Sequence, residues 1–495
     1  MLKNWINIFL FHIKNNKLFT ALNVLGLSIG IAGLIFAILY WNDEQSYDQW
    51  NPEKEKVFKV LSDIGKDVIW STNPGALEPY LKSDSRIANV VYHDWYQAEV
   101  FKYKGKTHVI NKTFNTQNDF FELFPFETLQ GNVETALSKE NSVAMNEKTA
   151  QKFFGNDNPI GKQIIHNKRI VTVTAIYSIP GNSSIAPNII INNMKSSIDE
   201  NKQQWGNFNF ALMIKLKNPN DKAAIEKKLN DLYYQNKTVK ESKSEGISIK
   251  EYINTYGSIT SILDPLSTIR LHSITKGMPE GEGNYQFLMI MVGLSILILI
   301  LSIVNYINLA TANAIKRAKE VGVRKIIGAT RLNIILQFIF ETVLTTLFSI
   351  LLALVIVELS LPYYNNFLGK NLIIFVNQFY VQLIIIFIMT VVVAGIFPAV
   401  YVANFETLKV IKGNFGRSKS GVWIRNGMLI VQFAIASFFI IGSYIVYQQV
   451  NYLANKDLGF VPTRIISVYW DKQNVDFSNE NYSKIIFNNY TRLTS

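Results

Sequence analysis

Two apolar runs, each long enough to cross a bilayer, flank a short basic segment in this chain. The runs are Tyr285–Ala310 and Ile334–Leu361, and a spanning helix needs roughly 20 apolar residues. The segment between them, Asn313–Arg331, carries Glu320 as its only acid and the basic residues Lys316, Arg317, Lys319, Arg324, Lys325 and Arg331. Because one Lys or Arg at mid-membrane costs about 2.5–3.5 kcal/mol, this segment stays in water, and its charge predicts the cytoplasmic side.

Three more apolar runs complete a predicted membrane topology, namely Phe19–Trp41, Phe379–Ala403 and Gly427–Gln449. With the N-terminus inside, the tail 1–18 and the loops 311–333 and 404–426 lie in the cytoplasm, and residues 42–284, 362–378 and 450–495 lie outside. The inner segments hold fourteen basic and two acidic residues, which accounts for the whole net charge of +12. This is the positive-inside pattern, so the charge does not call for a nucleic-acid partner.

The outer region 42–284 has the size and pattern of a folded domain. Arg169–Ile179 and Phe210–Lys217 alternate apolar and polar residues as strands do, and Asp221–Asn236 has the apolar spacing of a helix. An α+β domain is therefore expected, joined at its two ends to the first and second spans. The chain has no cysteine, and its five histidines show no metal-ligand spacing, so we expect no disulfide and no metal site.

Several ordered blocks of residues resemble the MacB/FtsX family of ABC transporter permeases, in its long duplicated form. They include LNVLGLSIGIA (Leu22–Ala32), ENSVAMNEKTAQKFFGNDNPIGKQI (Glu140–Ile164) and the most specific block, RAKEVGVRKIIGA (Arg317–Ala329). The resemblance implies an α-helical polytopic protein of the bacterial inner membrane, with a large MacB-type periplasmic core domain of α+β fold. A weak repeat, in which residues 425–457 follow the order of residues 16–47, predicts a fragment truncated in its second repeat.

In this family the loop after the second span holds a coupling helix that rests on a separate ATPase subunit. The resemblance places Arg317, Glu320, Gly322, Arg324, Lys325, Gly328 and Arg331 in the ATPase-facing set. Glu320 and Arg324 are spaced for an i,i+4 ion pair, and Gly328 suits a helix end. The alternative is that these charges only attract lipid headgroups.

We expect no enzyme activity and no cofactor in this chain, with ATP and Mg²⁺ bound by the partner ATPase. The nearest approach to a phosphate loop, Gly413–Ser420 (GNFGRSKS), lacks the required spacing. Other expected partners are membrane lipid, a second permease repeat in a dimer or pseudo-dimer, and a periplasmic adaptor.

Polar residues and small residues inside the spans are further candidates. Asn305, Asn308, Gln337 and Glu341 lie near the coupling segment, where hydrogen bonds across helices would hold its angle. Ordinary interfacial solvation is the alternative, favoured for Asn308 and Gln337. Gly26, Gly30 and Gly33 offer a small-residue face for helix packing.

The function implied is export or extraction of an amphiphilic substrate, such as a drug, a peptide or a lipoprotein, driven by the partner's ATP hydrolysis. An FtsX-like regulator of a periplasmic cell-wall hydrolase is the alternative. A signalling receptor is disfavoured, because the short inner loops leave no room for an output domain.

Overall fold

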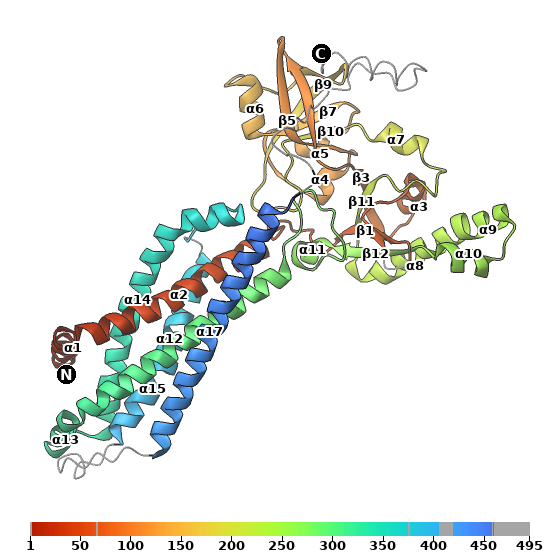
Figure 1. Cartoon of the computed structure of the whole chain (residues 1–495). Coiled ribbons are helices and arrows are strands. Elements are labelled where there is room, and N and C mark those ends of the chain that lie inside the picture. The colour runs from red at the N-terminus through yellow and green to blue at the C-terminus, as the bar shows by residue number, and fades with distance from the viewer. Residues whose placement is uncertain (1, 66–67, 375–376, 405–418, 458, 460–495) are drawn as a thin grey trace. The chain divides into compact units, whose positions relative to one another are not determined.

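The computed structural model describes residues 2–65, 68–374, 377–404, 419–457 and 459, in two compact units (Figure 1). A helical unit comprises residues 2–43 and 285–459, and an α+β unit comprises residues 44–284. Each unit is described by itself.

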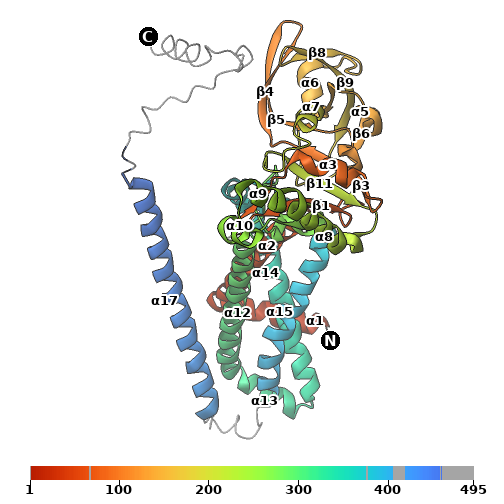
Figure 2. The same ribbon diagram turned by 90° about the vertical axis from the view of Figure 1, so that its right-hand side faces the viewer.

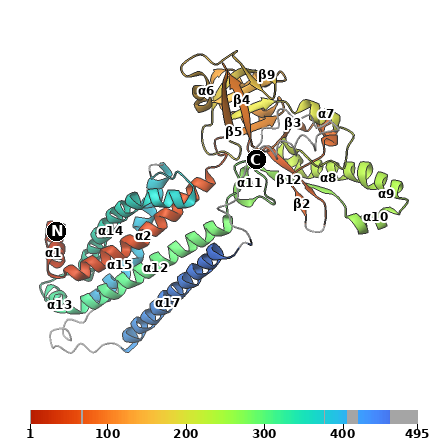
Figure 3. The same cartoon turned by 45° about the horizontal axis from the view of Figure 1, so that its top comes forward.

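Within the described residues, the helical unit consists of long helices and two shorter ones (Figures 1, 2 and 3). They are α1 (Leu2–Asn15), α2 (Lys17–Gln45), α12 (Tyr285–Lys316), α13 (Ala318–Ile326), α14 (Arg331–Leu368), α15 (Asn377–Ala403) and α17 (Lys419–Asn455). Within the described residues, five helices are long and apolar enough to cross a membrane, namely α2, α12, α14, α15 and α17.

Two segments expected as polar connections are helical. The N-terminal tail forms α1, whose Trp5 and Phe9 pack on Phe340 and Phe348 of α14 at ring-centroid distances of 5.6 and 6.4 Å. Helix α14 continues through Pro362, where an outer loop was expected to begin. It ends before Gly369, whose backbone adopts the left-handed conformation. Proline inside a spanning helix is tolerated because neighbouring groups satisfy the freed carbonyl. Most of the predicted loop 404–426 and of the predicted outer segment 450–495 lies outside the described residues.

The glycines of α2 pack on α12 of the same chain. A Cβ atom added at Gly30 would lie 2.7 Å from Ser302 Oγ and 3.1 Å from the Cα of Leu299, and one at Gly26 would lie 3.8 Å from Asn305 Nδ2. Ser295 Oγ donates to the Gly33 carbonyl at 3.0 Å, although a Cβ at Gly33 would meet nothing within 4 Å. Gly30 is therefore the position where only a glycine lets these two helices approach.

One twelve-stranded sheet runs through the α+β unit (Figure 2). Its strands are β1 (Val57–Asp63), β2 (Ile69–Trp70), β3 (Ile87–His93), β4 (Gln97–Tyr103), β5 (Lys106–Thr116), β6 (Glu127–Gly131), β7 (Ser142–Asn146), β8 (Gln163–His166), β9 (Arg169–Ser178), β10 (Ile189–Asn192), β11 (Ala211–Leu216) and β12 (Thr260–Pro265). The helices around it are α3 (Glu78–Lys82), α4 (Phe120–Leu123), α5 (Val133–Ala136), α6 (Glu147–Phe154), α7 (Lys195–Glu200), α8 (Lys222–Tyr233), α9 (Val239–Glu245), α10 (Ile249–Tyr256) and α11 (Leu266–His272), with short 3₁₀ turns at Gly75–Leu77 and Pro219–Asp221 and a π-helical turn at Tyr234–Thr238.

Half of the sheet closes into a small barrel. The order β10-β7-β9-β8-β4-β5 returns to its start because β10 also pairs in parallel with β5, Ile190 lying opposite Phe114. Apolar residues at alternate positions fill the interior, among them Phe101, Val143, Ile164, Val173 and Ile191. Closure removes exposed strand edges from this half of the unit.

The other half is an open sheet, β3-β11-β1-β12, covered by helices. Ile225, Leu229 and Tyr233 of α8 are buried in the cluster that also holds Phe58 and Leu212 of the sheet. The strands predicted from alternation are β9 and β11, and the predicted helix is α8, so these three predictions are confirmed.

A buried histidine makes the stability of this unit depend on pH. His93 is 3% exposed and packs against Phe114, and burial lowers its pKa from 6.5 to about 4. Because the unfolded chain binds this proton more readily, its contribution is complete above pH 6.5 and is lost as the pH falls toward 4. We expect acidification from pH 7 to 4.5 to cost the unit about 2 kcal/mol through His93. Denaturant unfolding of His93→Phe should show that much less pH dependence than the wild type, and an unchanged pH dependence would contradict this prediction.

Candidate coupling site

Helix α13, which lies in the predicted coupling segment, is fixed to the helical unit by a buried ion pair at its start. Arg317, which precedes α13, donates from Nη1 to Glu341 Oε2 at 2.7 Å and from Nη2 to Oε1 at 2.9 Å. The two side chains are 10% and 13% exposed, and the guanidinium lies 4.7 Å from the ring centroid of Phe338. A two-pronged contact of this kind sets direction as well as distance, so it orients the start of α13 on α14.

A second set of polar contacts continues along the same side of α13. Arg324 donates to Glu320 one helical turn earlier and to Gln337 of α14, and Gln337 Nε2 donates to Glu341 Oε1 at 3.0 Å. Burial alone would raise the pKa of Glu320, but the nearby His12 side chain and the charges of Arg317 and Arg324 outweigh it and lower the pKa to about 2. Glu320 is thus held as a carboxylate and links these groups.

The end of α13 is attached to a different spanning helix. Lys325 Nζ donates to the Ala403 carbonyl, the last residue of α15, at 2.8 Å. Beneath it, Val321 packs in a small buried cluster with Ile334 of α14 and Val402 of α15. Helix α13 is therefore braced on both α14 and α15.

The opposite side of this segment is apolar and exposed. Val323, Ile326 and Ile327 lie at helical spacing and are exposed, Ile327 at 80%, and Leu332 at the start of α14 continues the patch. We name Val323, Ile326, Ile327 and Leu332 the exposed apolar face. Gly328, at φ +103°, ends the helix beside it, in a conformation that favours glycine.

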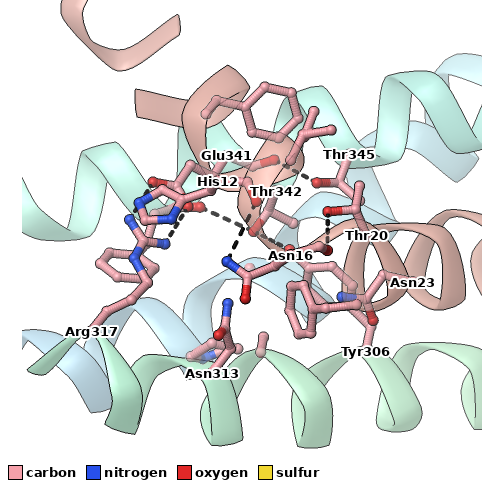
Figure 4. A pocket seen from close by; sticks show the side chains of 17 residues that line it. His12, Asn16, Thr20, Asn23, Tyr306, Asn313, Arg317, Glu341, Thr342 and Thr345 are labelled. Atoms are coloured by element: carbon pink, nitrogen blue, oxygen red, sulfur yellow. Dashed lines mark hydrogen bonds and ion pairs between the residues drawn. The ribbon is translucent and has the colours of Figure 1, made fainter. Parts of the chain in front are cut away.

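A small cavity lined by both polar and apolar side chains lies beside the Arg317–Glu341 pair (Figure 4). His12 of α1, Asn16 between α1 and α2, and Asn23 of α2 face Tyr306 and Asn313 of α12 across it. Its volume of about 60 Å³ accommodates about two waters, far less than the 300–1,000 Å³ of a pocket for a drug-sized ligand. Asn23 Oδ1 is buried and has no hydrogen-bond partner among the described residues, which suits a hydrated cavity.

The residues predicted from sequence divide into three groups here. Arg317, Glu320, Arg324 and Lys325 form the brace together with Gln337 and Glu341, and the expected Glu320–Arg324 pair is present. Gly322 is buried, whereas Gly328 and Arg331 are exposed beside the apolar face. Asn305 and Asn308 take no part in the brace, and Asn308 Nδ2 is buried without a partner within the described residues.

Sequence analysis missed two components. His12 of α1 lies 3.7 Å from Glu320, which the amphipathic pattern of the N-terminal tail could have suggested. The exposed apolar face gave no sequence signal, because isoleucines next to spanning segments resemble membrane residues.

Comparison with protein families agrees with this architecture. Residues 20–232 match the model of the MacB-like periplasmic core domain, and residues 292–407 match that of the FtsX-like permease C-terminal region. The chain belongs to the MacB/FtsX family of ABC transporter permeases. It is a multi-pass inner-membrane permease whose α+β unit is the MacB-like periplasmic domain.

Among curated relatives of this MacB/FtsX permease are two macrolide export ATP-binding/permease proteins called MacB. The protein of Aggregatibacter actinomycetemcomitans is 24% identical over 67% of this chain and 49% of its own length, and that of Mannheimia succiniciproducens is 20% identical over 80% and 59%. The chain therefore spans about half the length of the first relative. The solved periplasmic region of MacB from Actinobacillus actinomycetemcomitans, 17% identical, overlaps 43% of this chain and 90% of that one at a TM-score of 0.29.

Proposed function

We propose that this permease couples ATP hydrolysis by a separate ATPase subunit to movement of its periplasmic domain, for export or extraction of an amphiphilic substrate. In this proposal α13 lies on the cytoplasmic side and the ATPase docks on it. The observation that carries the proposal is the two-sided construction of α13. One side is braced on α14 and α15, and the other is an exposed apolar face.

The contacts of α13 narrow the set of residues that we expect to face the ATPase. The charged groups of Arg317, Glu320 and Arg324 pair with one another and with Gln337 and Glu341 of α14. These three residues would therefore transmit force within the permease rather than contact the ATPase. The ATPase would instead contact the exposed apolar face, which Arg331 flanks. Apolar side chains that are desolvated on binding and rimmed by Arg are typical of interface anchors.

Co-purification of the ATPase tests this assignment. The double variant Ile326→Asp with Ile327→Asp leaves every contact of the brace in place, so we expect at least a tenfold loss of bound ATPase, about 1.4 kcal/mol, and loss of its stimulated hydrolysis. The matched control is Ile170→Asp, a comparably exposed isoleucine on the periplasmic domain. Wild-type levels of bound ATPase in the double variant would exclude this face as the docking surface.

A further inference from the structure

The two chain segments that join the periplasmic domain to its first two spans are partly buried and hydrogen-bonded to the domain. The first is residues 44–51, which follow α2 from its last turn, and the second is residues 278–284, which lead into α12. Buried residues in them include Glu44, Asp48, Asn51 and Met278.

Asp48 anchors the first connection to the loop between β9 and β10. Its Oδ1 accepts from Ser183 Oγ at 3.0 Å and from the Ser184 amide at 3.0 Å, and its Oδ2 accepts from the Ser184 hydroxyl. The Asp48 amide in turn donates to the Asn182 carbonyl at 2.8 Å. Asp48 is fully buried at φ +57°, a backbone conformation rare for residues other than glycine, so the surroundings must impose it.

Arg270 of α11 contacts both connections with one guanidinium. Nε donates to Glu44 Oε2 at 2.6 Å and Nη2 to Oε1 at 3.1 Å, which holds the end of α2. Nη1 donates to the Gly281 carbonyl at 2.9 Å, which holds the second connection. The guanidinium also lies 3.8 Å from the ring centroid of Tyr47, and the Arg270 carbonyl accepts from the Gly283 amide at 2.6 Å.

The β9–β10 loop and β5 reach the second connection as well. The Glu280 amide donates to the Ser184 carbonyl at 3.2 Å, so the loop that holds Asp48 also holds Glu280. The Glu280 carboxylate accepts from Lys112 Nζ of β5 at 2.8 Å at both oxygens. Each connection is therefore tied to the same elements of the domain.

We infer that Asp48 and Arg270 are positioning residues that fasten both membrane connections into one collar at the base of the periplasmic domain. The collar, defined as residues 44–51, 182–184, 270 and 278–284, makes the two connections move together, so movement of the spans reaches the domain as a whole. Flexible connections would absorb that movement. The inference rests on the proposed function for its purpose, but the collar itself can be tested without any ATPase.

Pulsed electron paramagnetic resonance on the full chain in detergent provides that test. Because the chain has no cysteine, Gln45→Cys with Asn284→Cys gives a unique spin-label pair, one exposed residue on each connection. We expect a narrow distance distribution that Arg270→Ala broadens at least twofold. Arg270→Lys, which keeps the charge but loses the fork, should fall between the two.

The matched control is Arg86→Ala, which breaks a two-pronged arginine pair with Asp84 elsewhere in the same domain. Should Arg270→Ala yield no folded chain, Glu44→Gln keeps the side-chain size and should still broaden the distribution. Equal widths in wild type and in the folded Arg270 or Glu44 variants would overturn the collar, and would leave ATPase docking untouched. Loss of ATPase binding with an intact collar would instead contradict the proposed function.

Discussion

Replacing Arg317 by alanine is expected to destabilise the helical unit by about 3–5 kcal/mol. The guanidinium and the Glu341 carboxylate are both largely buried and satisfy each other through two hydrogen bonds. Removing one partner leaves a buried charge without compensation, which is why single changes in such pairs are costly. Unfolding of the purified chain in mixed detergent micelles, followed by tryptophan fluorescence, measures the change in free energy.

The double variant Arg317→Met with Glu341→Leu separates stability from coupling. Replacing both charges with apolar residues of similar size is often neutral for stability, so most of the lost free energy should return. The direction imposed on α13 would still be lost, and stimulation of the ATPase should stay low. Arg331→Ala, an exposed arginine of the same segment, is the control and should change the free energy of unfolding by less than about 0.5 kcal/mol. An equally small effect of Arg317→Ala would mean that the pair does not brace α13.

Replacing Gly30 by leucine is expected to cost at least about 3 kcal/mol, the upper end of ordinary overpacking. The first added carbon would already lie 2.7 Å from Ser302 Oγ and 3.1 Å from the backbone of α12 at Leu299. A side-chain oxygen can turn away, but the backbone of a packed helix cannot, so α2 and α12 must separate.

Gly33→Leu, on the same helix as Gly30, is the matched control for this prediction. A Cβ atom added at Gly33 would meet nothing within 4 Å. We expect it to change stability by less than about 1 kcal/mol, since a helix interior slightly disfavours glycine. Cysteine pairs placed across α2 and α12 would report the separation by slower disulfide formation. Similar behaviour of the two leucine variants would show that Gly30 is not a contact position.

Much of the fold could be predicted from sequence because membrane spans and half-buried strands leave strong periodic signals. The five apolar runs correspond to α2, α12, α14, α15 and α17, each of which extends beyond the predicted run at one or both ends. The closure of the barrel could not be foreseen. It depends on the parallel pairing of β10 with β5, a contact between segments far apart in the chain that no local pattern encodes.

The candidate site was only partly predictable for the same reason. The basic segment gave the position of the coupling helix, and the spacing of Glu320 and Arg324 gave one pair. Sequence could not distinguish charges that are used internally from residues left exposed. The resemblance places Arg317 among the residues that face a separate subunit, yet in the structure its guanidinium binds Glu341 on α14. The collar was equally invisible, because Asp48 and Arg270 lie far apart in sequence and no local pattern connects them.

The proposed role of α13 is to present its exposed apolar face to a cytoplasmic ATPase. Its most direct test is a single cysteine, Ile327→Cys, in a chain that otherwise has none. This role predicts that a membrane-impermeant maleimide labels this cysteine only from the cytoplasmic side of membrane vesicles. It also predicts that a short thiol-to-amine crosslinker joins the cysteine to an ATPase subunit, with less product once Ile326 is changed to Asp. Labelling only from the periplasmic side, or no ATPase in the crosslinked product, would contradict it.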